Sequence, residues 1–127
     1  MNTLYPIARQ NFLTGQLNWT NNDIRIALFD NTVNYTPTHT TIGQVGTPIS
    51  LGSTILNRTA TNGMAAGSPT VYNGLTNPVE VAVAVLYRST DGLLIAYMDQ
   101  VNGFTFLPTG ADYTLSPGGT NGAYFSL

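Results

Sequence analysis

The chain is poor in ionisable side chains. Its 127 residues include no cysteine and a single histidine, His39, and charged residues make up 8% of the total. The lack of cysteine excludes disulfides and thiolate metal ligands. One histidine cannot form a cluster of histidine ligands, and the spacing of the six acids suggests no catalytic pair. We therefore expect a binding protein that is not an enzyme, with no catalytic residues, cofactor or metal site.

The charge balance and the hydropathy pattern argue against nucleic acid and membranes as partners. A formal net charge of -2 disfavours binding to a phosphate backbone, which requires a basic surface. No segment approaches the ~20 apolar residues that span a bilayer. Residues 1–10 lack the basic and apolar regions of a secretory signal. We expect no nucleic acid and no membrane as partners, and synthesis in the cytoplasm without export.

The residues that are present favour β-structure. Hydrophobic residues make up 43% of the chain, and Thr, Asn, Gly, Ser and Pro dominate the remainder, as in strands joined by turns. The length fits one domain, and no repeat or linker divides it. We therefore interpret residues 1–127 as a single β domain.

One short helix is predicted near the N-terminus. Pro6 suits the first helical position, residues 7–13 contain no helix breaker, and Gly15 is a stop signal. A helix of two or three turns is marginal by itself, so residues 1–19 should dock on the domain or on a partner. We expect their removal to weaken partner binding more than the fold. The candidate partner contacts are the large apolar residues of this segment, Tyr5, Phe12, Leu17 and Trp19.

Alternating patterns predict the strands. In residues 24–30 the apolar side chains alternate, which predicts a half-buried strand. Residues 31–46 are polar and Thr-rich, and we expect a long loop with little core of its own. Shorter strands are predicted at 47–51, 55–59, 70–72, 104–107, 113–116 and 123–127.

The strongest local pattern is a hairpin over residues 79–99. A three-residue loop ending in left-handed Gly92 would pair Tyr87 with Ile95 and Val85 with Tyr97. Both faces of this hairpin are apolar, so it should be central and covered on both sides. About eight short strands and one helix predict an all-β fold, an antiparallel β-sandwich or a barrel-like domain with a short N-terminal helix.

Several short motifs resemble a known group of proteins. They are Phe12-Leu13-x-Gly15, Leu17-x-Trp19, Asp23-Ile24-Arg25 with Leu28 and Asp30, Tyr35 with His39, and the C-terminal segment LLIAYMDQVNGFTFLPTGADYTL. The chain is similar to small virion structural proteins of tailed bacteriophages, although it has no lysine and few acids. The match covers most of the chain.

The resemblance implies a function. It suggests a capsid decoration or cement protein that binds the assembled head and bridges major capsid protein subunits. Such a protein would be a homo-oligomer at a capsid symmetry axis, with a two-fold axis favoured, and would be located in the virion at the capsid surface. A tail or head-to-tail component is the alternative. A carbohydrate-binding β-sandwich, with Trp19 and the seven tyrosines as stacking platforms, is a third hypothesis, and a small hydrolase is the least favoured.

Overall fold

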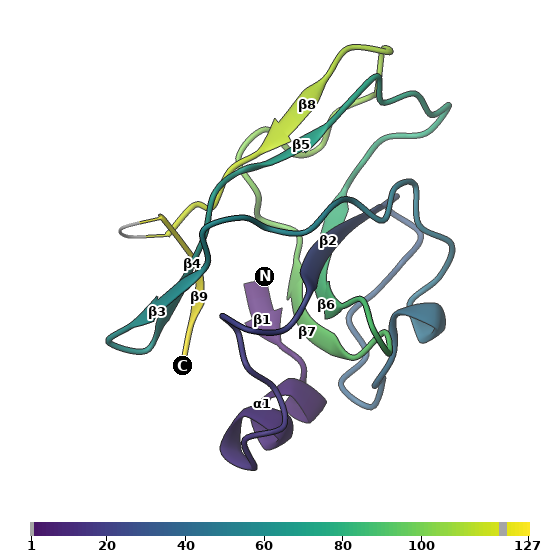
Figure 1. Cartoon of the computed structure of the whole chain (residues 1–127). Helices are drawn as coiled ribbons and strands as arrows, with labels where there is room; N and C mark the ends of the chain where they lie inside the picture. Colours follow the sequence, from purple (N-terminus) through teal and green to yellow (C-terminus); the bar gives the residue numbers. More distant parts are fainter. Residues whose placement is uncertain (1, 120–121) are drawn as a thin grey trace.

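The computed structural model describes residues 2–119 and 122–127 (Figure 1). It contains short strands, one α-helix and one 3-10 turn. In chain order these are β1 (Asn2–Leu4), α1 (Pro6–Leu13), β2 (Ile24–Phe29), η1 (Ile42–Gln44), β3 (Thr59–Thr61), β4 (Met64–Ala66), β5 (Thr70–Tyr72), β6 (Val83–Arg88), β7 (Leu94–Met98), β8 (Tyr113–Leu115) and β9 (Ala123–Ser126).

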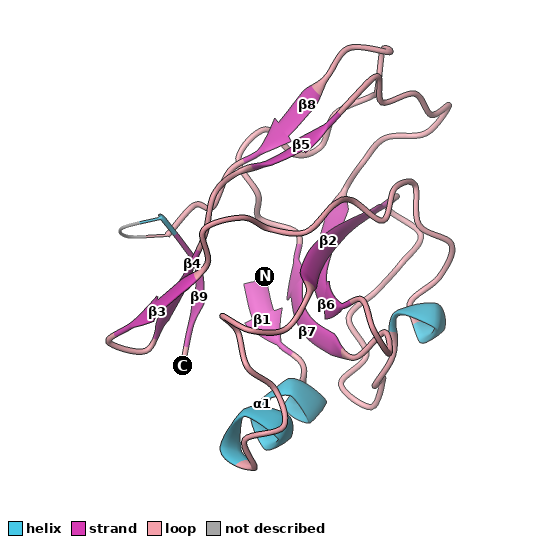
Figure 2. Cartoon of the chain, viewed as in Figure 1, coloured by secondary structure: helices cyan, strands magenta, loops and turns pink. Residues whose placement is uncertain are grey.

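The strands form three antiparallel sheets. The largest has the order β1-β7-β6-β2, and the two smaller ones are β3-β4-β9 and β5-β8. Strands account for 35% and helices for 10%, and none of the sheets, as far as the structure describes them, closes into a barrel. Long loops join these short elements (Figure 2). The predicted all-β fold is confirmed in its sandwich-like form.

The N-terminal helix forms where the sequence predicts it. Pro6 occupies the first turn of α1, and Gly15 follows the helix with φ +75, a conformation that glycine adopts readily. Ala8 is fully buried, and Phe12 packs at the edge of the core. Strand β1, which the sequence pattern did not predict, pairs with β7 and fixes the start of this segment to the largest sheet.

The loop of the central hairpin begins one residue earlier than predicted. The Arg88 N–H donates to the Leu93 carbonyl at 2.9 Å, so the turn comprises the four residues 89–92 instead of three. Gly92 has φ +75, as expected. The prediction that Ser89 pairs with Leu93 is therefore wrong by one position.

A β-bulge restores the register of this hairpin. Tyr87 pairs with Leu94 and not with Ile95, whereas Val85 pairs with Tyr97 as predicted. Ile95 is the extra residue of the bulge, and it faces the opposite side of the sheet from Tyr97. The predicted face shared by these two residues is thus wrong, because strict alternation does not anticipate a bulge.

Both faces of the large sheet are buried, as predicted for the hairpin. The main core lies between this sheet and the two smaller sheets, and a second core lies on the other face. Strand β2 contributes to both, with Ile26 and Leu28 in the main core and Ala27 and Phe29 in the second. The prediction that β2 is half-buried is therefore wrong, because a second layer covers its other face.

That second layer is the loop 31–46. Val33 and Val45 are buried in the second core, and Tyr35 and Ile42 pack against it. Figure 1 shows this loop on one side of the large sheet and the small sheets on the other. The expectation that the loop has little core of its own is wrong, because a few spaced apolar side chains among polar ones are enough to cover a sheet face.

Of the other predicted strands, 47–51 and 104–107 form only isolated bridges, and 55–59 contributes only Thr59 to a strand, β3. Segments 47–51 and 55–59 run beside β2, where the Leu28 N–H donates to Ser50 at 2.8 Å and the Ile55 N–H donates to Ile24 at 2.9 Å. Segment 104–107 is bridged to Val81 only through Phe106. Conversely, β3 and β4 form a hairpin around Asn62 and Gly63, which the strand predictions above do not include. A segment that forms only one or two bridges lacks the consecutive paired residues that define a strand.

We predict that Gly52→Ala destabilises the protein by about 2–4 kcal/mol, from the left-handed backbone and local overpacking. Gly52 has φ +72, and a Cβ there would lie 2.5 Å from the Ile26 carbonyl oxygen, the acceptor of the Tyr72 hydroxyl. The measurement is urea unfolding. Gly43→Ala, with open space around the added methyl, is the control, and equal stability of the two variants would contradict the prediction.

Candidate partner-binding surface

The structure places three of the four predicted partner contacts inside the monomer. Tyr5 is fully buried in the second core, and Leu17 and Trp19 are each 4% exposed in the main core. Phe12 is half-buried at the surface. Phe12 is therefore the most exposed of the four, and the contact of any of them with a partner stays a prediction.

Trp19 joins the N-terminal segment to the sheet β3-β4-β9. Its indole N–H donates to the Ala66 carbonyl at 3.0 Å. Its ring meets Phe125 edge-on, with centroids 5.2 Å apart, and Tyr124 at 6.2 Å. A buried indole with its donor satisfied is a core residue.

Arg58 stabilises the segment around Trp19 by donating hydrogen bonds to backbone carbonyls. Its guanidinium donates to Trp19 at 2.7 Å and to Thr20 at 3.3 Å, and also to Ile55 and Asn22. Desolvation lowers the pKa of Arg58 from its usual value. The sequence analysis did not single out this residue, since a lone arginine in a loop carries no motif.

An apolar hollow remains open beside Trp19. It has a volume of about 220 Å³ and lies between α1, the 17–19 turn and the sheet β3-β4-β9. Its apolar lining comprises Phe12, Leu17, Trp19, Ala60, Met64, Ala65, Phe125 and Leu127. We refer to it as the apolar hollow.

Two leucines near the apolar hollow are exposed to solvent. Leu13, next to Phe12 in α1, is 89% exposed, and Leu127, which lines the hollow, is 65% exposed. Leu13 lies outside the helix face that Ala8 and Phe12 share. That position is the signal by which the sequence could have identified it, because a leucine off the buried face of a short helix has nothing to pack against.

The charged side chains mostly serve the fold. Arg25 pairs with Asp23 at 3.2 Å and Arg88 with Asp91 at 2.8 Å. Asp23 also accepts from the Thr54 hydroxyl at 2.6 Å, and these bonds lower its pKa to about 2. In residues 2–119 and 122–127, no three His, Cys, Asp or Glu side chains group to hold a metal ion.

The aromatic residues offer little surface for sugar stacking. Tyr5, Tyr72, Tyr87, Tyr97 and Tyr124 are buried with Trp19, and Tyr35 and Tyr113 are half-buried. Burial raises the pKa of Tyr113 to about 12 and that of Tyr72 further. These rings pack against one another, so the carbohydrate-binding hypothesis gains no support from the geometry.

Comparison with known proteins finds no match among family models, curated proteins or solved structures. Within the described part of the chain, no helix has the length and hydrophobicity needed to cross a membrane. The arguments about function therefore rest on the residues and surfaces described above.

Asp23→Asn should lower stability at pH 7 and flatten its dependence on pH. The pKa of Asp23 is about 2 in the fold and 3.8 ordinarily, so its ionised form stabilises the fold above about pH 4. That contribution is lost as the pH falls from about 4 towards 2. Urea midpoints across this range measure it, and Glu80→Gln controls for net charge. An unchanged slope in Asp23→Asn would refute the linkage.

Deletion of residues 1–19 should unfold the chain, contrary to the expectation from the sequence. The deletion removes Leu4, Tyr5, Leu17 and Trp19, all buried, and each large apolar side chain contributes about 1.5–3 kcal/mol. The total of about 6–12 kcal/mol is comparable with the whole stability of a domain, about 5–15 kcal/mol. Circular dichroism melting curves test this, with Leu13→Ala as a folded control. A cooperative melt of the truncated chain would contradict it.

Proposed function

We propose that this chain is a virion structural protein of a tailed bacteriophage, located at the capsid surface. It acts as a decoration or cement protein that binds the assembled head and bridges neighbouring major capsid protein subunits. The support is the resemblance of its motifs to such proteins, together with an exposed apolar surface that the monomer leaves uncovered.

The exposed leucine beside the apolar hollow is the observation on which the proposal rests. Leu13 belongs to the Phe12-Leu13-x-Gly15 motif and is 89% exposed, whereas Leu17, Trp19 and Ile24 of the neighbouring motifs are buried. Burying one leucine on a partner contributes about 1.5–3 kcal/mol. An apolar hollow with one exposed leucine, Leu127, in its lining and another, Leu13, next in the chain to a lining residue is typical of a protein interaction site.

The low charge of the chain is compatible with such a role. The described ion pairs, Asp23–Arg25 and Asp91–Arg88, are internal to the monomer. Contacts with a partner would thus depend on apolar burial and on hydrogen bonds, which salt screens little. Closed symmetric assemblies favour two-fold axes, so we propose a homo-oligomer at a two-fold axis of the capsid.

We predict that decorated heads resist heat better than heads without the protein, and that decoration survives molar salt. The reason is that apolar contacts between the protein and two capsid subunits must break before the shell opens. The measurement is DNA release on heating, with and without the protein, over a salt series. Identical release curves would argue against cement function and favour the tail or head-to-tail alternative.

Leu13→Asp tests whether the exposed surface at Leu13 contacts the capsid. A charge in place of the exposed leucine should reduce occupancy on heads about tenfold or more, since it removes the leucine burial and desolvates an aspartate. Leu107→Asp is the matched control, because Leu107 is 54% exposed and lies outside the apolar hollow. Equal occupancy of the two variants would place the contact elsewhere.

A further inference from the structure

Two strands with an open edge lie on either side of one groove. Strand β1 is the edge of the large sheet, and β9 is the edge of the sheet β3-β4-β9. A cavity of about 280 Å³ lies between them, lined from β1 by residues 2–4 and from β9 by residues 124–126. We name this cavity the β1–β9 groove. Edge strands present unpaired backbone groups to whatever lies beside them.

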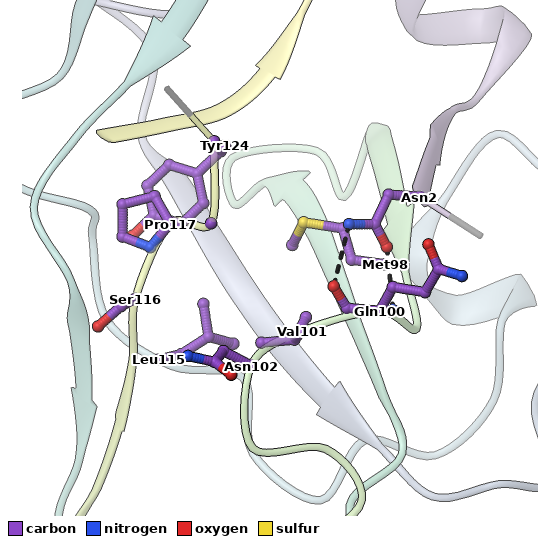
Figure 3. A pocket seen from close by; sticks show the side chains of 11 residues that line it. Asn2, Met98, Gln100, Val101, Asn102, Leu115, Ser116, Pro117 and Tyr124 are labelled. Atoms are coloured by element: carbon purple, nitrogen blue, oxygen red, sulfur yellow. Dashed lines mark hydrogen bonds between the residues drawn. The ribbon is translucent and has the colours of Figure 1, made fainter. Parts of the chain in front are cut away.

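The groove continues into a second cavity of about 220 Å³. The two cavities share Asn2, Met98 and Tyr124 in their lining. Figure 3 shows Asn2 and Met98 on one side of this second cavity, Tyr124 on the other and Val101 between them. Together the two cavities form an elongated site, a shape that suits an extended chain.

The backbone alternation of β1 directs polar groups into the groove. The Tyr5 N–H donates to the Ile95 carbonyl at 2.9 Å, towards β7. Since successive residues of a strand point their N–H and C=O groups to opposite sides, Asn2 and Leu4 point theirs away from β7. The Leu4 carbonyl accepts from the Tyr35 hydroxyl at 3.3 Å, which leaves the Leu4 N–H and both groups of Asn2 for an added strand.

Strand β9 has the same property. The Leu127 N–H donates to the Gly63 carbonyl at 2.8 Å, towards the β3–β4 hairpin. By alternation, Ser126 directs its backbone groups to the other side, which is the groove, whereas a bulge in the pairing with β4 interrupts the alternation before Tyr124. An inserted strand would therefore meet donors and acceptors on both of its edges.

The side chain of Asn2 holds β1 in place at the groove. Its amide nitrogen donates to the Gln100 carbonyl at 3.3 Å, and its amide oxygen accepts from the Gln100 N–H at 3.0 Å (Figure 3). This two-point contact continues the β1–β7 pairing beyond Met98. The edge is thus pre-organised, which lowers the entropic cost of adding a strand.

Among the described residues, one charged side chain, Arg9, lines the 280 Å³ cavity of the groove, and none lines the second cavity. The other three arginines are engaged, Arg25 and Arg88 with carboxylates and Arg58 with carbonyls. Within the described residues, the exposed Arg9 side chain has neither a hydrogen bond nor an ion pair. A free guanidinium at the rim of an otherwise uncharged groove is complementary to one carboxylate on the occupant.

We propose that the β1–β9 groove binds an extended segment of another protein by strand addition. The segment alternates apolar and uncharged polar side chains and carries one acidic residue that pairs with Arg9. Its backbone bonds to β1 and β9 and joins the two sheets, while its apolar side chains enter the cavities beside Met98 and Tyr124. This proposal does not depend on the virion assignment.

A separate polypeptide fits the groove better than a second copy of this chain. Asp23 and Asp91 are bound to arginines, Asp30 accepts from Thr32 at 2.5 Å, and Asp112 accepts from the Gly74 N–H at 2.8 Å. Glu80 is exposed, but it immediately precedes Val81, which is already bridged to Phe106. Asp99 directly follows β7, which is already paired with β1 and β6. In its described part, a second copy of the chain therefore has no carboxylate on an unpaired extended strand that could enter the groove and pair with Arg9.

Selection of random nine-residue peptides on the full-length protein tests the proposal. We expect the selected peptides to alternate apolar and polar residues and to contain Asp or Glu. A synthetic copy of the most enriched peptide should bind Arg9→Glu about fivefold more weakly than wild type, because the charge reversal removes one partly exposed ion pair. Arg9→Lys should retain binding within about twofold.

Two controls separate strand addition from simple charge attraction. Gln10→Glu places a negative charge on the neighbouring position of α1, which lines neither cavity, and should leave affinity within about twofold of wild type. Peptides N-methylated at either the odd or the even residues should not bind. The reason is that a strand between β1 and β9 uses one set of N–H groups towards each edge. Bound peptide should slow hydrogen exchange at Leu4 and Ser126.

Four results of the peptide experiments would overturn the proposal. They are no enrichment over a blank surface, enrichment without acidic residues, equal affinity for wild type and Arg9→Glu, and tolerance of N-methylation. Sedimentation would also overturn it if wild type were a dimer and Arg9→Glu a monomer, since a second copy of the chain would then occupy the groove. The heat-release experiment on phage heads is independent of all of these, so failure of one does not imply failure of the other.

Discussion

The architecture depends on covering both faces of one apolar sheet. Strands β2, β6 and β7 bury side chains on either side, so a single covering layer would leave a full face of Val, Tyr and Leu in water. The small sheets cover one face and the loop 31–46 covers the other. The irregular parts of the chain are thus as necessary to the fold as its strands, and the N-terminal segment supplies residues to both cores.

With few charged residues, the polar contacts that hold these layers end on backbone carbonyls. The Tyr72 hydroxyl donates to Ile26 at 2.7 Å, Tyr87 to Leu51 at 3.0 Å and Tyr124 to Ser68 at 2.6 Å, and Arg58 binds carbonyls alone. Carbonyls of irregular segments lack ladder partners, and these donors satisfy them where they are buried. The apolar hollow and the β1–β9 groove lie on either side of Phe125, so the two candidate binding surfaces adjoin each other.

Local sequence signals were sufficient to predict that the helix, the β2 strand and the central hairpin exist. Pro6 and Gly15 mark the ends of α1, and Gly92 marks the turn of the hairpin, because these residues act through their own backbone conformation. The register close to the turn was mispredicted, since the bulge at Ile95 arises from packing on two faces at once. Among the predicted partner contacts, residue type pointed to Phe12, which stays half-buried, and equally to Tyr5, Leu17 and Trp19, which the fold buries.

The sequence alone determined the all-β class, the single helix and a surface with little charge, because composition and periodicity act locally along the chain. Tertiary structure alone decided which apolar residues stay exposed, that β1 and β9 leave their edges open towards each other, and that Arg9 is the arginine left unpaired. The physical reason is that exposure and pairing are properties of neighbours in space. Residues 2–4 and 124–126 lie at opposite ends of the sequence, and only folding brings them to the same groove.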